Sequence, residues 1–186
     1  MKSKKYYSEQ YEVTPQLGGG RIKYEVTYKG DYFRYGVPDK KLLNIRILFL
    51  AVTLACAALF VVAGLLDTVG TRRLWVALPY VGMFLPVAWM LYACIKQFFA
   101  KRDMTEKEHD SVVGDLKKAT LGLVITSGLT FAGTAVFLLT EKVPDPSKEW
   151  MFLGMVFFLF IISFGLWKYQ RSIPVITINQ QQYKKD

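Results

Sequence analysis

The sequence predicts an all-α membrane protein, a four-transmembrane-helix bundle with a small β-rich cytoplasmic cap from the N- and C-terminal segments. The first observation is that the hydrophobic residues, 52% of the chain, gather in uncharged runs at 47–66, 74–95, 119–140 and 150–167. Each run is near or above about 18 residues, a length that favours a membrane-spanning helix. The second observation is an uneven distribution of positive charge around these runs. The third is that strand-like alternation occurs only outside them.

The apolar runs divide the chain into three parts. The predicted transmembrane domain covers 42–171, with helices at about 44–66, 74–99, 117–140 and 150–170. We expect residues 1–41 to be a cytoplasmic β-hairpin within an aromatic, basic segment, and residues 172–186 to be a cytoplasmic strand and tail. The first forty residues lack the apolar stretch of a secretory signal, so the first run is expected to stay in the protein as a span.

The formal charge of +9 becomes informative when it is assigned to the two sides of a membrane. Of the 24 Lys and Arg residues, the outer connections hold only Arg72, Arg73, Lys142 and Lys148. The positive-inside rule therefore places both termini in the cytoplasm. The expected partner of the remaining cations is the lipid bilayer with its anionic inner leaflet, and not nucleic acid. The short connections favour a bacterial cell membrane.

The N-terminal segment carries the clearest strand signal. Apolar and polar residues alternate over 22–28, Gly30 and Asp31 suit a tight turn, and 32–35 can return as a second strand. Residues 10–14 are a weaker third strand, and the β-branched residues of 173–178 are a possible partner. We expect one antiparallel sheet made from both termini; the alternative is that these segments are disordered or lie separately in the membrane interface.

The same segment is rich in tyrosine, which favours a surface that binds another protein. An exposed strand edge can accept a strand from a partner, and side chains along it then give specificity. We expect Tyr24, Tyr28, Tyr32 and Arg34 to be the docking residues.

The third apolar run has its small and hydroxylated residues on one stripe. Gly122, Thr126, Thr130 and Thr134 recur every four residues, and Gly133 lies beside them. Small residues allow helix backbones to approach each other closely in lipid, so the stripe is expected to pack against neighbouring helices. The alternative is that the hydroxyl groups line a polar path; packing is favoured, because threonine can return its hydroxyl to the preceding turn.

The second run contains Pro79 and Pro86, seven residues apart and on about the same face. Each proline removes a backbone donor and can kink the helix. They are a candidate hinge, although prolines are common in membrane helices and an ordinary kink is the more economical interpretation.

Residues that carry chemistry are sparse. The middles of the apolar runs contain no ionisable residue, Cys56 and Cys94 are expected to pack as small apolar side chains, and His109 has only loop carboxylates nearby. We expect no cofactor, no metal and no enzymatic activity; an enzyme acting on lipid has the least support. The predicted function is a non-catalytic accessory or scaffold subunit, whose partners are other membrane protein subunits or further copies of itself. The alternative is a small oligomeric transporter or channel with a hydroxyl-lined path.

Overall fold

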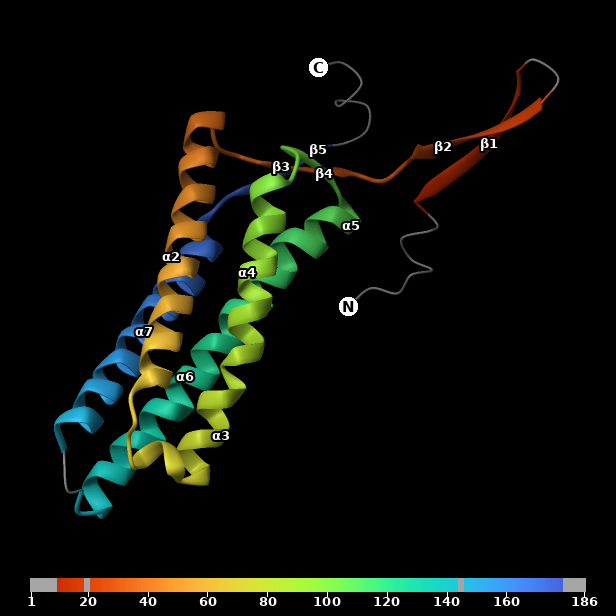
Figure 1. Ribbon diagram of the computed structural model, residues 1–186. Helices are drawn as coiled ribbons and strands as arrows, with labels where there is room; N and C mark the ends of the chain where they lie inside the picture. The colour runs from red at the N-terminus through yellow and green to blue at the C-terminus, as the bar shows by residue number, and fades with distance from the viewer. Residues whose placement is uncertain (1–9, 19–20, 144–145, 179–186) are drawn as a thin grey trace. The chain divides into compact units, whose positions relative to one another are not determined.

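The computed structural model describes residues 10–18, 21–143 and 146–178, and Figure 1 shows the course of the chain. The chain separates into two compact units. Among the described residues, a small β-containing unit comprises 10–18, 21–36, 101–111 and 174–178, and a helical unit comprises 37–100, 112–143 and 146–173. We describe each unit by itself.

The helical unit contains the long apolar segments. Its elements are α2 (Asp39–Leu65), the 3₁₀ turn η1 (Gly70–Arg72), α3 (Leu74–Gly82), α4 (Phe84–Phe99), α6 (Asp115–Thr140) and α7 (Pro146–Ser172). Four helices are long and apolar enough to cross a membrane, over Asp39–Leu65, Leu74–Phe99, Glu106–Thr140 and Pro146–Ser172. Only 22–28% of their most apolar windows is buried within the chain, so most of this apolar surface needs an apolar environment. The prediction of four such helices is confirmed.

The four helices pack as a closed ring. α2 lies against α4 and α7, and α6 lies against α3, α4 and α7. Helices that follow one another in the chain are therefore neighbours, as in an up-and-down bundle (Figure 1). The centre of the ring is filled by large side chains that are almost completely buried: Phe49, Met83, Met90, Leu123, Phe137, Phe152 and Leu159.

The second predicted span is divided at Met83, where α3 ends and α4 begins. The amide of Met83 donates both to the Pro79 carbonyl at 3.1 Å and to the Tyr80 carbonyl at 3.0 Å. Pro86 follows within the first turn of α4, a position where its missing N–H costs little. The two prolines thus lie on either side of the break.

The small unit contains two separate antiparallel sheets and the short helix α5 (Glu106–His109). The first sheet is the hairpin of β1 (Tyr11–Gly18) and β2 (Arg21–Tyr28). The second has the strand order β4-β3-β5, formed by β4 (Asp103–Thr105), β3 (Tyr32–Tyr35) and β5 (Val175–Ile178).

The strand pairing confirms one prediction and corrects another. The segments at 32–35 and 173–178 do pair, with Tyr32 opposite Ile178 and Tyr35 opposite Val175. The predicted hairpin of 22–28 with 32–35 is wrong, because β2 pairs with β1 over eight residues, a longer ladder than β3 can offer. The other neighbour of β3 is β4, which comes from a charged loop that gave no strand signal.

Candidate functional site

The stripe on α6 points partly into the bundle. Thr130 and Thr134 are fully buried, whereas Thr126 is half-buried. Each hydroxyl donates to the carbonyl four residues earlier: Thr126 to Gly122 at 2.9 Å, Thr130 to Thr126 at 2.9 Å and Thr134 to Thr130 at 2.8 Å. The hydroxyl groups are therefore satisfied within their own helix, as the packing interpretation expects.

The buried face of α6 includes two hydroxyl residues that the four-residue spacing misses. A helix turns once in 3.6 residues, so a row with four-residue spacing drifts around it. Ser127 takes the buried position in place of Thr126, and Thr120 continues the face toward the start of the helix. Gln170 of α7 donates from Nε2 to the Thr120 hydroxyl oxygen at 2.9 Å, and this bond links α6 to α7. Thr120, Ser127, Thr130 and Thr134 are separated by seven, three and four residues, the spacings of one helix face, and this pattern identifies both residues in the sequence.

Two glycines of α6 lie against the turns of α3 and α4 that contain Pro79 and Pro86. Pro79 has no N–H to offer the Trp75 carbonyl, and a Cβ atom at Gly133 would lie only 3.0 Å from that carbonyl oxygen. A Cβ atom at Gly122 would lie 3.3 Å from Cβ of Pro86. Both contacts depend on the absence of a side chain on α6. The hinge role of Pro79 and Pro86 stays a prediction.

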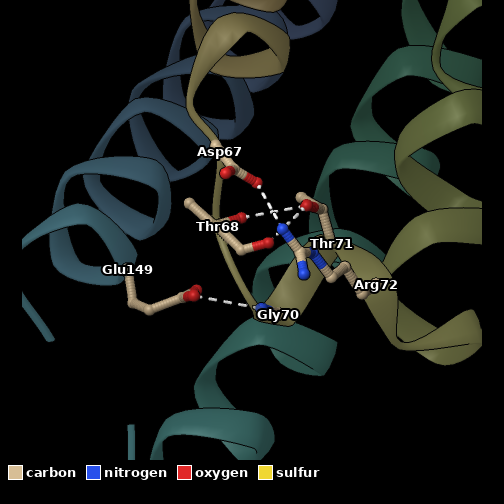
Figure 2. A network of polar contacts seen from close by, with 6 residues as sticks. All are labelled: Asp67, Thr68, Gly70, Thr71, Arg72 and Glu149. Carbon is tan, nitrogen blue, oxygen red and sulfur yellow. Dashed lines mark hydrogen bonds and ion pairs between the residues drawn. The ribbon is translucent and has the colours of Figure 1, made fainter. Parts of the chain in front are cut away.

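The connection between α2 and α3 holds a small polar network, shown in Figure 2. The Thr71 hydroxyl donates to the Thr68 carbonyl at 2.8 Å, and the Thr68 hydroxyl donates to the Thr71 hydroxyl at 3.1 Å. Arg72 pairs with Asp67 at 3.1 Å on the exposed side. These bonds hold the turn in which the amide of Gly70 faces α7.

Glu149 in the first turn of α7 completes this network, and no sequence pattern singles it out. Its side chain is 1% exposed, and its Oε1 accepts the Gly70 N–H at 3.0 Å (Figure 2). Its Oε2 has no hydrogen-bond partner among the described residues. A Cβ atom at Gly70 would lie 2.8 Å from this oxygen. Glu149 therefore ties α7 to η1 inside the helical unit.

Cysteine and histidine are residue types that can carry redox or metal chemistry, and in this chain they are buried or stacked on another side chain. Cys56 and Cys94 are free and buried, and the Cys94 sulfur lies 3.1 Å from the Thr53 hydroxyl. His109 stacks on Phe33 with ring centroids 4.7 Å apart. Among the residues that the structure describes, no group of three or more His, Cys, Asp or Glu could hold a metal ion.

The four predicted docking residues differ in how far they are used within the small unit. Tyr24 is 68% exposed, whereas Tyr28 is only 8% exposed and Tyr32 is half-buried against it, with ring centroids 5.2 Å apart. Arg34 forms a two-pronged ion pair with Asp103 across β3 and β4, at 2.5 and 3.1 Å. Tyr24 is thus the member whose side chain is most accessible to a partner.

Tyr28 connects three segments of the small unit through its hydroxyl group. The hydroxyl accepts the backbone N–H of Glu106 at 3.1 Å and lies 3.1 Å from the Asp31 carbonyl and 3.2 Å from Oε1 of Gln10. Burial raises the pKa of Tyr28 above its ordinary value of 10.0, and the hydrogen bond from the Glu106 backbone acts in the opposite direction. The hydroxyl is consequently neutral at physiological pH.

Removing this hydroxyl group should loosen the start of α5. We expect Tyr28→Phe to destabilise the small unit by about 1 kcal/mol, because the Glu106 amide loses its acceptor. Hydrogen exchange at Glu106 should accelerate about five-fold. Tyr24→Phe is the matched control, since Tyr24 is exposed, and it should leave that exchange rate unchanged. Equal rates in both variants would show that the hydroxyl does not hold α5.

Comparisons with protein-family models, with curated proteins and with solved structures give no match for this chain. The assignment of function therefore depends on the residues and contacts described above.

Proposed function

We propose that this chain is a non-catalytic accessory or scaffold subunit of a larger integral membrane complex, in a bacterial cell membrane and with both termini in the cytoplasm. The observation that carries the proposal is a bundle with large apolar side chains buried inside it, in which the threonine hydroxyl groups of α6 donate to carbonyls of their own helix. Such a bundle offers other proteins a surface rather than an internal site.

The arrangement of the small sheet supports the proposed topology. β3 precedes the first long helix, β4 lies between the second and third, and β5 follows the fourth. All three strands pair in one sheet, which requires them to lie on the same side of a membrane. Two membrane crossings between β3 and β4, and two more between β4 and β5, bring all three strands to one side. The distribution of Lys and Arg favours the cytoplasm as that side.

The filled interior favours scaffolding over the alternative, a hydroxyl-lined path. Met90, Leu123 and Leu159 are completely buried at the centre of the ring. Thr130 and Thr134 donate their hydroxyl protons to their own helix. A path that used Thr126, Thr130 and Thr134 would have to displace the helices packed against them. The support for a small oligomeric transporter is correspondingly weaker.

One face of α2 suits a transmembrane helix of another subunit. Ala51, Ala55 and Ala58 are exposed on this face and follow a spacing of four and three residues. Apolar burial drives helix association little in lipid, and small residues permit the close backbone contact that does. The face is thus suited to a helix from a different subunit. Tyr24 and the outer edges of β1 and β2, which pair only with each other among the described residues, would supply a second contact outside the membrane.

A photo-reactive residue at this face tests the proposal. With p-benzoylphenylalanine at Ala55, irradiation of membranes from the native host should give one defined adduct with a different membrane protein. The matched control is the same replacement at Leu129, an exposed apolar position of α6, which should give lipid adducts only. Adducts at Ala55 with lipid alone, or only with a second copy of this chain, would contradict an accessory role.

A further inference from the structure

We infer that the headgroup of an anionic phospholipid binds at the end of the α6–α7 seam, to Lys117 of α6 and to Lys168 and Arg171 of α7. All three side chains belong to the helical unit and are exposed. The inference is independent of the accessory role and requires only that the helices lie in a membrane.

The seam is set by contacts between the two helices. Gly128 of α6 faces the ring of Phe160, with 3.3 Å between its Cβ position and the nearest ring carbon. Phe131 lies against Phe157 with ring centroids 5.3 Å apart. The bond between Gln170 and Thr120 then aligns the two helices at the other end of the seam.

Lys117 belongs to the same side of α6 as Gly128. The two residues are eleven positions apart, which is close to three full turns of a helix. Lys117 also lies one turn before Thr120, and Arg171 directly follows Gln170. Since Thr120 and Gln170 are bonded to each other, Lys117 and Arg171 come to the same end of the seam.

An aromatic stripe on α7 leads to these cations. Phe157, Phe160, Phe164, Trp167 and Arg171 follow a spacing of three, four, three and four residues, so they lie on one face of the helix. This face adjoins α6, because Phe157 and Phe160 contact it. Phe157 and Phe164 nevertheless keep 41% and 40% of their surfaces exposed.

The two cations of α7 are held over rings of this stripe. The Arg171 guanidinium carbon lies 3.9 Å from the Trp167 ring centroid, and the Lys168 ammonium lies 5.7 Å from that of Phe164. A guanidinium over a ring keeps its N–H donors available for a phosphate oxygen. Aromatic and basic residues together are also the usual anchors of a helix at the headgroup level.

Charge decides which lipid fits. At the opposite end of the bundle, Arg72 pairs with Asp67 and Arg73 with Glu141. In contrast, within the described ranges, no acidic side chain lies within 4.0 Å of Lys117, Lys168 or Arg171. Beyond Glu149, α7 contains no acidic residue at all. Three positive charges without an acidic neighbour in the part of the chain that the structure describes favour a headgroup with a net negative charge over a zwitterionic one.

The length of the stripe points to a whole lipid rather than a free anion. From Phe157 to Arg171 the helix rises roughly 21 Å at about 1.5 Å per residue. Half of a hydrocarbon core is about 15 Å thick, so one acyl chain can lie along the stripe while its phosphate reaches the cations.

Native mass spectrometry of the full chain in detergent tests the site. The probes are phosphatidylglycerol and phosphatidylcholine with identical acyl chains, and sodium phosphate in a third arm. The unaltered chain should retain phosphatidylglycerol selectively. In Lys168→Gln/Arg171→Gln its affinity should fall roughly 30-fold, because each basic residue near an anionic headgroup contributes about five-fold.

Two matched variants keep the test decisive. Lys142→Gln/Lys148→Gln removes the same charge at the other end of the bundle and should leave selectivity intact. Lys168→Arg/Arg171→Lys keeps the charge and should retain the lipid. Equal binding of both lipids by the unaltered chain, or equal losses in the two Gln variants, would overturn the assignment. Displacement of the lipid by equimolar phosphate would also overturn it, in favour of a site for free anions.

Discussion

Glu149→Ala is expected to lower the free energy of unfolding of the chain by about 2–4 kcal/mol. The change removes the acceptor of the Gly70 N–H, which is buried in the connection between α2 and α3. It also leaves a void where the 1%-exposed side chain packed. The first effect costs about 1–3 kcal/mol for a buried donor without a partner, and the void adds to it.

Unfolding in mixed micelles with increasing sodium dodecyl sulfate measures this effect. Glu141→Ala is the matched control, because Glu141 pairs with Arg73 at a partly exposed position and should change stability by less than about 1 kcal/mol. Glu149→Gln retains an oxygen for the Gly70 amide and should fall between the control and Glu149→Ala. A loss in Glu149→Ala no larger than in the control would show that this carboxylate does not hold α7 to η1.

Gly133→Leu is expected to have the second large effect, a loss of about 1–3 kcal/mol from overpacking between α3 and α6. Even the first added atom would lie 3.0 Å from the Trp75 carbonyl oxygen and 3.7 Å from Val76. A backbone carbonyl cannot move aside as a flexible side chain can. The two helices must therefore separate, and the contacts around Val76, which is completely buried, are lost.

The control for this prediction is Gly165→Leu on α7. Apart from its chain neighbours and the nearby backbone of its own helix, no described residue places a heavy atom within 4 Å of the Cβ position at Gly165, so the added side chain has open space. Leucine is the better helix former, and the control should be neutral or more stable by up to about 1 kcal/mol. The same denaturation experiment applies to both variants. If both change stability equally, the close approach of α3 and α6 does not depend on Gly133.

The helical part of the fold could be predicted because each span is an uninterrupted apolar run. Such runs can be recognised without knowing which helices lie beside them, since a helix satisfies its own backbone hydrogen bonds in lipid. The pairing of β3 with β5 was also within reach, because β-branched residues follow the fourth run and both segments belong on one side. The pairing of β2 with β1 could not be predicted in the same way. The turn signal at Gly30 and Asp31 is local, and the longer ladder with β1 outweighs it.

The polar contacts inside the bundle were harder to predict because they depend on which helices meet. Nothing near Glu149 in the sequence indicates that the Gly70 amide will face it, since the two are far apart in the chain. The buried positions of Ser127 and Thr120 were not predicted, because a row of residues spaced by four gradually turns away from one face of the helix. Tyr28 was predicted as a docking residue from its place in an aromatic strand, but its hydroxyl is used by the Glu106 amide.

The central claim is that four helices cross a membrane and leave β3, β4 and β5 on its cytoplasmic side. Single cysteines test it directly, in a chain where Cys56 and Cys94 are replaced by alanine. In intact cells, an impermeant maleimide should label Arg72→Cys and Lys142→Cys, and it should label Lys29→Cys and Thr177→Cys only after permeabilisation. Labelling of Lys29→Cys or Thr177→Cys in intact cells, at the rate found for Arg72→Cys, would contradict the account.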